Sequence, residues 1–152
     1  MTTSTSRVEL LGAAQSFCEG FAQGKDLDTI LSYFSDSQDP MAIEHGLPIL
    51  APFLGRPFTG KPGIRQYFTM LADLLTYENM RFSEYVVDPD VRKVSVKGQA
   101  KFAWKKTGNS WDETFTYTLD FDGQGKVARY QVWADSGAAY LARIGELDSY
   151  HG

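Results

Sequence analysis

From residue 94 onward, hydrophobic and polar side chains alternate along the chain with a period of two. In residues 94–104, the positions on one side are hydrophobic or glycine, and serine, glutamine and lysine fill most positions between them. In residues 113–119, threonines alternate with larger side chains. This period is typical of β-strands with one covered face and one solvent-facing side. We therefore predict strands over residues 80–88, 93–106, 111–121 and 126–135.

Two short segments with turn-forming composition separate the last three of these strands. Residues 107–110 read Thr-Gly-Asn-Ser, and residues 122–125 read Asp-Gly-Gln-Gly. Glycine, asparagine and aspartate favour the backbone conformations of tight hairpin turns. Strands joined by such turns run antiparallel, so the sequence predicts an antiparallel meander with one hydrophobic face.

The first half of the chain shows helical periodicity instead. Hydrophobic residues between Val8 and Phe21 recur every three or four positions, which indicates an amphipathic helix. Ser6 and Glu9 form a capping-box pattern at its start, and Gly24 suits its end. Asp26 or Asp28 can cap a second helix that extends to residue 34.

A short predicted strand and a long loop connect these helices to a third helix. Residues 41–45 form the strand, and residues 46–60 form a loop rich in proline, glycine and phenylalanine. Loops of this length are often lids or interface arms, although a rigid surface arm explains the composition equally well. The third helix covers residues 62–75, with Pro62 near its first turn. A short final helix covers residues 136–144.

Composition places the chain among single-domain globular proteins. Of the 152 residues, 43% are hydrophobic and 14% are aromatic, enough to fill a core and to line a cavity. We expect one domain over residues 1–152, with frayed residues 1–5. The net charge of -4 argues against a nucleic-acid partner. The sequence contains one cysteine, and it shows no signal-peptide pattern and no apolar run long enough to span a membrane. We therefore expect a cytoplasmic protein without membrane contact.

Several segments resemble the NTF2-like superfamily. Residues 60–68 (GKPGIRQYF) are similar to the entry of its third helix, and residues 25–34 (KDLDTILSYF) resemble its second helix. Residues 122–127 (DGQGKV), with Trp133-Ala134-Asp135 after them, resemble the last hairpin of its SnoaL-like branch. The resemblance covers roughly residues 8–144. It implies an α+β cone, in which three N-terminal helices pack on a strongly curved antiparallel sheet with a short C-terminal helix.

Within this superfamily, the resemblance to the ketosteroid-isomerase-like branch points to three positions. The catalytic base of that enzyme follows the first strand, where this chain has His45. Its two oxyanion donors correspond to Tyr117 and Cys18. None of the three residue types is kept, so the resemblance does not imply steroid isomerisation by the same mechanism.

Three residues are candidates for catalysis. His45 can exchange protons near neutral pH, or it is a hydrogen-bonded histidine beside Gly46. Tyr117 can polarise a carbonyl group, or it is a core tyrosine. Asp135 matches a base of the SnoaL-like branch, but strand parity directs it outward, and capping of the final helix is the simpler role. We expect His45 and Tyr117 to line one cavity.

Aromatic side chains on the predicted inner face are candidates for contacts with a ligand. Glu113 shares their parity and lies at the edge of the pocket or reaches into it. The complete set of expected contact residues is Trp104, Phe102, Phe115, Tyr130, Tyr67, Phe53 and Cys18. The sequence contains no HxxxH, CxxC, HExxH or GxSxG motif, so we expect no metal, no cofactor and no serine nucleophile.

Two functions fit these observations. The first is a cofactor-free isomerase, cyclase or dehydratase that transfers protons on an apolar, carbonyl-containing small molecule. The second is a non-catalytic ligand-binding or dimerisation module with a filled pocket. An open cavity that both His45 and Tyr117 face would favour the enzyme, and a closed core would favour the module. Because Trp133 is predicted to face outward from the sheet, we also expect a homodimer through that face.

Overall fold

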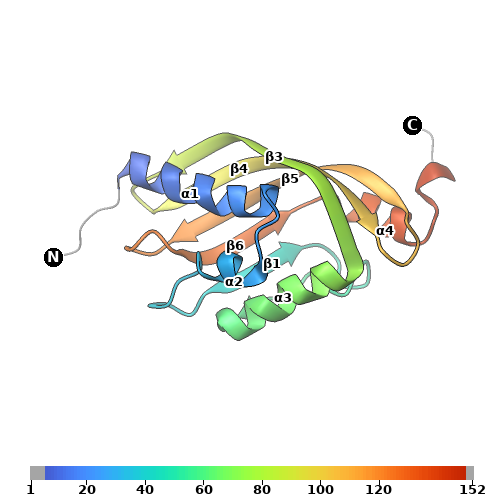
Figure 1. Cartoon of the computed structure of the whole chain (residues 1–152), viewed down its shortest axis with the longest axis horizontal. Helices are drawn as coiled ribbons and strands as arrows, with labels where there is room; N and C mark the ends of the chain where they lie inside the picture. Colours follow the sequence, from blue (N-terminus) through green and yellow to red (C-terminus); the bar gives the residue numbers. More distant parts are fainter. Residues whose placement is uncertain (1–5, 150–152) are drawn as a thin grey trace.

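Both N-terminal helices begin at predicted capping residues, but the second helix ends at Leu31 and not at residue 34 as predicted. The computed structural model describes residues 6–149 (Figure 1). Helix α1 (Arg7–Ala22) starts at Ser6, whose hydroxyl accepts a hydrogen bond from the backbone N–H of Glu9, and Gly24 follows its end with φ of 65°. Helix α2 (Leu27–Leu31) starts at Asp26, whose carboxylate accepts from the N–H of Thr29 at 2.8 Å. These caps confirm the predicted starts of both helices.

Six strands form one sheet in the order β2-β1-β6-β5-β4-β3. The strands are β1 (Met41–His45), β2 (Phe58–Thr59), β3 (Leu75–Asp88), β4 (Lys93–Trp104), β5 (Ser110–Phe121) and β6 (Val127–Trp133). Strands β3 to β6 make the predicted antiparallel meander, while β1 pairs with β6 in parallel. The meander and its turns are therefore confirmed, and β2 and the parallel pair are additions to the prediction.

Strand β3 is longer than predicted because it follows helix α3 (Gly60–Leu74) without a turn. Its pairing with β4 shifts register twice, and Asn79 and Glu84, with φ of 57° and 59°, lie at these two shifts. Such bulges bend a strand and increase its twist. They curve the edge of the sheet around the helices.

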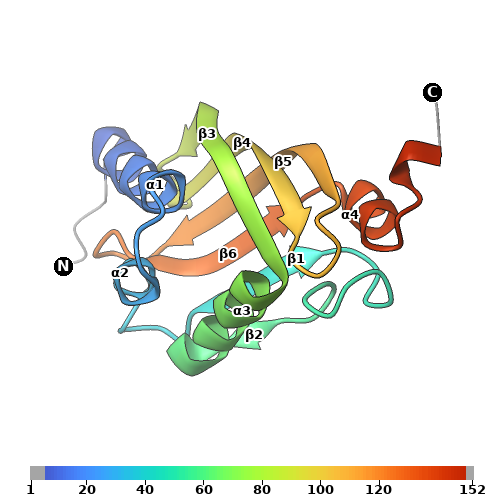
Figure 2. The same ribbon diagram turned by 45° about the vertical axis from the view of Figure 1, so that its right-hand side comes forward.

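Helices α1, α2 and α3 lie on one side of the bent sheet, and helix α4 (Ser136–Arg143) lies at one end of it (Figures 1 and 2). The indole N–H of Trp104 donates to the carbonyl oxygen of Ala139 at 2.9 Å, which attaches α4 to β4. A short 3-10 turn (Leu147–Ser149) follows α4.

The inner face of the sheet carries the hydrophobic core. Along β5, every second residue from Trp111 to Phe121 is buried, and in the first part of the strand the threonines between them are exposed. On β4, Val94, Val96, Ala100 and Trp104 are buried in the same way. The predicted α+β architecture with helices on the covered face of a curved sheet is confirmed.

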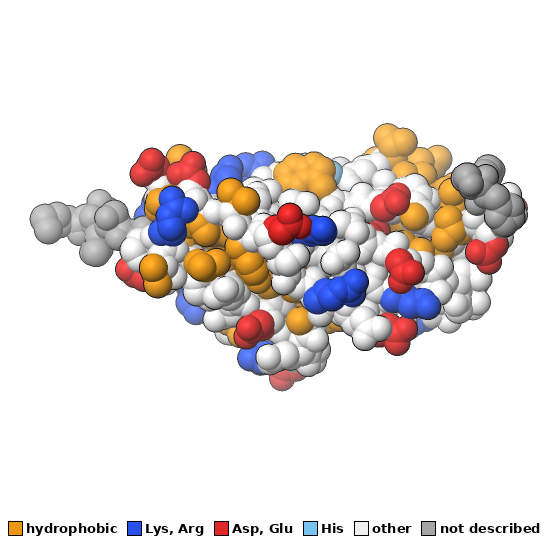
Figure 3. Space-filling model, turned by 90° about the horizontal axis from the view of Figure 1, so that it is seen from above, with side chains coloured by type: hydrophobic (Ala, Val, Ile, Leu, Met, Phe, Trp, Pro, Cys, Tyr) orange, Lys and Arg blue, Asp and Glu red, His pale blue; other side chains and the backbone are white. Residues whose placement is uncertain are grey.

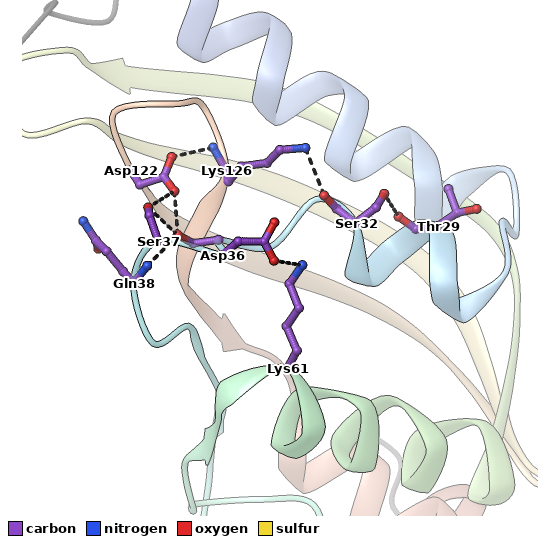
Figure 4. A network of polar contacts seen from close by, with 9 residues as sticks. Thr29, Ser32, Asp36, Ser37, Gln38, Lys61, Asp122 and Lys126 are labelled. Atoms are coloured by element: carbon purple, nitrogen blue, oxygen red, sulfur yellow. Dashed lines mark hydrogen bonds and ion pairs between the residues drawn. The ribbon is translucent and has the colours of Figure 1, made fainter.

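The turn between β5 and β6 is joined to the segment after α2 by buried Asp122 (Figure 4). Its carboxylate accepts hydrogen bonds from the Ser35 hydroxyl at 2.5 Å and from the backbone N–H groups of Gln124 and Lys126 at 2.8 and 3.0 Å. This network fixes the segment that leads into β1.

Candidate active site

A cavity of about 340 Å³ lies between the inner face of the sheet and the covering helices. Its volume is within the range of small-molecule sites in proteins. Side chains from α2, α3, the loop before β2, the sheet and α4 contribute to its wall. The wall is mainly hydrophobic, and its aromatic rings include Phe21, Phe53, Phe68, Phe102, Trp111 and Phe115.

Glu44 reaches this cavity from the short strand β1. In β1, Ala42 and Glu44 share one face, because successive side chains of a strand alternate. The Tyr67 hydroxyl donates a hydrogen bond to Oε1 of Glu44 at 2.7 Å. Burial raises the pKa of Glu44 to about 7, against the opposing effect of the Tyr67 bond, and the nearby charge of Glu113 adds to the rise.

Glu113 supplies a second carboxyl from strand β5. Its Oε1 accepts hydrogen bonds from the indole N–H of Trp111 at 3.0 Å and from the backbone N–H of Asp135 at 3.2 Å. Burial raises the pKa of Glu113 to about 7, although both hydrogen bonds oppose this, and the charge of Asp135 contributes to the rise.

Two carboxyls with a pKa near neutrality can act as an acid and a base at the same pH. Because their charges interact, ionisation of one disfavours ionisation of the other, so singly ionised forms are favoured around neutral pH. Burial raises the pKa of Tyr67, Tyr117 and Tyr130, so these phenols stay protonated. The site can therefore accept a proton at one carboxylate and donate one from the other carboxylic acid.

The structure places His45 outside this cavity. Its ring stacks on Trp133 with the ring centroids 4.4 Å apart, and its Nε2 makes a 2.9 Å hydrogen bond with the side-chain oxygen of Gln131. His45 follows Glu44 directly, and neighbouring residues of a strand face opposite sides of the sheet. The expectation that His45 and Tyr117 line one cavity is wrong.

Tyr117 does line the cavity, but its neighbours are aromatic. It is buried, and its ring centroid lies 4.9 Å from that of Tyr130 and 5.2 Å from that of Phe115. Tyr117 therefore lines the cavity as expected, but His45 does not face it.

Asp135 caps helix α4. Its carboxylate accepts a hydrogen bond from the backbone N–H of Ala138 at 2.9 Å, which confirms the predicted cap. Asp135 also borders the cavity, and its own N–H binds Glu113. It therefore connects the last helix to the second carboxyl of the site.

Most of the expected contact residues line the cavity. Phe53, Tyr67, Phe102, Phe115 and Tyr130 belong to its wall. Trp104 and Cys18 do not, and these two expectations are wrong.

Trp104 and Cys18 miss the cavity because each is engaged in packing between layers. The indole of Trp104 is bonded to the backbone of α4. Cys18 is fully buried on α1, where burial raises the pKa of its thiol to about 12.

Glu44 was not predicted as a site residue, although the strand that carries it was. The hydrophobic residue Ala42 shares its parity, and this was the signal that the acid near the end of β1 faces inward. The predicted catalytic residue, His45, is the next residue of the same strand. A shift of one residue along a strand moves the chosen side chain to the opposite face.

Within residues 6–149, no three side chains of His, Cys, Asp or Glu are grouped to hold a metal ion. None of the helices in the same range has the length and apolar composition to cross a membrane.

Comparison with known proteins identifies the fold. No protein-family model and no curated protein matches the chain. Among solved structures, an NTF2-like protein from Burkholderia xenovorans LB400 is similar with a TM-score of 0.71 and 18% identity, over 90% of this chain and 97% of that chain. The BvnE pinacolase from Penicillium brevicompactum is similar with a TM-score of 0.69 and 17% identity, over 95% and 97%.

A third similar structure is TerC co-crystallised with polyporic acid. Its TM-score is 0.71 and its identity 18%, over 93% of this chain and 99% of that chain. The similarities extend over nearly the whole length of each protein. These similarities show that the chain has the fold of NTF2-like proteins.

Proposed function

We propose that this protein is a cofactor-independent enzyme that transfers protons on an apolar, carbonyl-containing small molecule, as an isomerase or lyase. The observation that carries the proposal is the pair of carboxyls, Glu44 and Glu113, in one aromatic-lined cavity. Buried carboxyls with a raised pKa are characteristic of acid–base sites. Tyr67 holds the Glu44 carboxyl in place by its hydrogen bond.

The two carboxyls allow a balanced isomerisation. The carboxylate takes a proton from a carbon atom next to the substrate carbonyl, and the carboxylic acid gives a proton to the substrate. The total number of protons on substrate and enzyme is unchanged, but the two carboxyls have exchanged their protonation states. Exchange with water through the carboxyls then restores the starting form.

The similar proteins support a small organic ligand. One of them is named a pinacolase, and another was crystallised with polyporic acid. The open cavity of about 340 Å³ meets only part of the criterion for an enzyme, because Tyr117 faces it and His45 does not. The support for an enzyme over a binding module therefore comes from Glu44 and Glu113 in place of His45. Binding without chemistry is the alternative outcome of the test below.

Nitrobenzisoxazole is a suitable probe of the proposed base, because no natural substrate is needed. A base removes its ring C–H proton while the N–O bond breaks, and a coloured cyanophenolate forms. We expect the protein to accelerate this reaction with a rate that rises through pH about 7, the pKa of Glu44 and Glu113. Glu44→Gln should lower the rate about 10²–10⁴-fold, the usual loss for a general base.

Two controls make this test specific. His45→Ala and Glu146→Gln should keep the wild-type rate, since neither side chain lines the cavity. A rate no faster than that of acetate in solution would contradict the proposal. Wild-type rates in both Glu44→Gln and Glu113→Gln would contradict it as well, and the binding module would then replace the enzyme.

We also propose that the protein forms a homodimer through the outer face of the sheet. Trp133 is 45% exposed there, beside threonines of β5, and its stacking on His45 holds the indole in one orientation. In a view from above, hydrophobic patches lie among charged side chains (Figure 3). A large exposed aromatic ring on a polar sheet face is typical of an interface. We propose in addition that the protein is located in the cytoplasm. The buried, free thiol of Cys18 is compatible with a reducing compartment.

A further inference from the structure

The charged residues that border the cavity are mainly acidic. Glu44, Glu113 and Asp135 approach it from three different elements, and the exposed residues Asp73 and Lys25 also border it. Lys25 is the one lysine or arginine in this part of the wall. The fixed charges of the site therefore oppose an anion and favour a cation.

Three hydrogen-bond donors of the wall are already engaged. The hydroxyl of Tyr67 and the indole of Trp111 donate to the two carboxyls, and the hydroxyl of Tyr77 donates to the carbonyl oxygen of Phe21 at 2.7 Å. Stabilising an enolate needs donors that point at its oxygen, and these groups point elsewhere.

The aromatic wall favours positive charge as well. The faces of aromatic rings carry partial negative charge, and they attract cations, most strongly where water is excluded. Phe21, Phe68, Phe102, Phe115 and Tyr130 line the same cavity as the two carboxyls. Carboxylates and ring faces together form an environment for an organic cation.

We propose that the enzyme acts acid first: it binds a neutral, apolar carbonyl compound and stabilises it as an oxygen-protonated cation. This inference rests on the proposed function and adds the order of the steps and the sign of the developing charge. The carboxylic acid transfers its proton to the carbonyl oxygen and becomes a carboxylate. The second carboxylate then removes a proton from the adjacent carbon, which leaves a neutral enol.

Three probes that share a naphthyl ring test the sign of this charge. They are naphthylmethyl trimethylammonium, its neutral isostere with carbon in place of nitrogen, and naphthoate. We expect the cation to bind about tenfold tighter than the neutral isostere at pH about 8, consistent with desolvated cation–π contacts. Naphthoate should bind more weakly than both.

The pH dependence of binding gives a second readout. A bound cation lowers the pKa of Glu44 and Glu113 below their value of about 7 in the free protein, so binding should release protons below neutrality. The affinity for the ammonium should rise with pH up to about 7 and then level off. The neutral isostere should bind equally at every pH. Calorimetry in buffers of different ionisation enthalpy measures the released protons.

Glu44→Gln and Glu113→Gln assign the effect to the two carboxyls. Each should lose most of the preference for the cation and retain binding of the neutral isostere, which also reports that the cavity is intact. Glu146→Gln, on the exposed surface, should behave as the wild type. Tighter binding of naphthoate than of the ammonium, or an unchanged preference in both cavity variants, would overturn the inference. If either of these results occurred while the protein still accelerated the nitrobenzisoxazole reaction, the proposed proton-transfer function would be retained. Only the acid-first order of the steps would then be abandoned.

Discussion

At the scale of single residues, the site depends on keeping two carboxyls in an apolar environment. Burial raises the pKa of both Glu44 and Glu113 from 4.5 to about 7. A carboxyl that binds protons more tightly in the folded state contributes stability at low pH. This stability is lost as the pH rises from about 4.5 through about 7. The same desolvation that tunes the chemistry therefore weakens the fold at neutral and alkaline pH.

Glu44→Gln tests this relation directly. Glutamine keeps the shape but cannot ionise, so we expect the variant to be more stable than the wild type by on the order of 2 kcal/mol at pH about 8. At pH about 4 the difference should be near zero or reversed. Urea unfolding at the two pH values measures it, and a difference independent of pH would contradict the account.

At the scale of elements, the strand pair β4–β5 determines how much of the cavity is filled. Gly98 lies directly opposite Phe115, and a Cβ atom on Gly98 would overlap the Phe115 ring. The missing side chain allows this ring to lie flat over β4. The cavity wall at this place is therefore set by a glycine of the neighbouring strand.

Gly98→Ala should destabilise the protein by about 1–3 kcal/mol, the usual cost of an overpacked core. The displaced ring should also reduce binding of the larger naphthyl probes. Gly12→Ala is a matched control, because nothing lies within 4 Å of an added Cβ on this exposed position of α1. It should stabilise the fold by up to about 1 kcal/mol. Equal unfolding midpoints for both variants would refute the role of Gly98.

The turn between β5 and β6 depends on Asp122 in a similar way. Burial alone would raise its pKa, but hydrogen bonds from Ser35, from two backbone N–H groups and from Ser37 outweigh this and lower the pKa below 3.8. Asp122→Ala should cost about 2–4 kcal/mol at neutral pH. Ser37→Ala, which removes one 3.2 Å contact, should cost less.

The pKa of Asp122 is lowered in the folded protein, so ionised Asp122 stabilises the fold above pH 3.8. This stability is lost as the pH falls through the pKa that Asp122 has in the folded protein. The stability difference between wild type and Asp122→Ala should therefore shrink in acid. Thermal unfolding at pH about 7 and about 3 measures this, and a constant difference would argue against a hydrogen-bonded carboxylate.

Most elements could be predicted from the sequence because each has a local signal. Caps at Ser6 and Asp26 and the period of two in β4 and β5 specify their own segments. The start of β3 could not be predicted, since Leu75 continues the hydrophobic stripe of α3 and no turn residue intervenes. The parallel pairing of β1 with β6 joins residues far apart in the sequence, and no local pattern reports it.

The site was predicted less well than the fold, for a physical reason. Its aromatic wall follows from strand parity, so five of the seven expected contact residues line the cavity. The choice between Glu44 and His45 depends on one residue of register in a five-residue strand. Trp104 has the inward parity, but it packs against α4 and not beside the cavity.

At the scale of the whole molecule, the two faces of the sheet have different roles. The inner face carries the carboxyls and the aromatic wall, and the outer face carries His45 and Trp133. If the outer face pairs two copies, Trp133→Glu should shift a wild-type dimer to monomers, because an interface core excludes unpaired charge. Sedimentation at micromolar concentration measures this, and a monomeric wild type would refute the dimer.

The proposed acid–base chemistry requires two carboxyls in the cavity that titrate near neutrality. NMR titration of the side-chain carboxyl carbons, with glutamate isotopically labelled, measures both of them. We predict two resonances with midpoints near 7, one of which disappears in Glu44→Gln and the other in Glu113→Gln. A spectrum in which every glutamate titrates below pH about 5 would contradict the proposed chemistry.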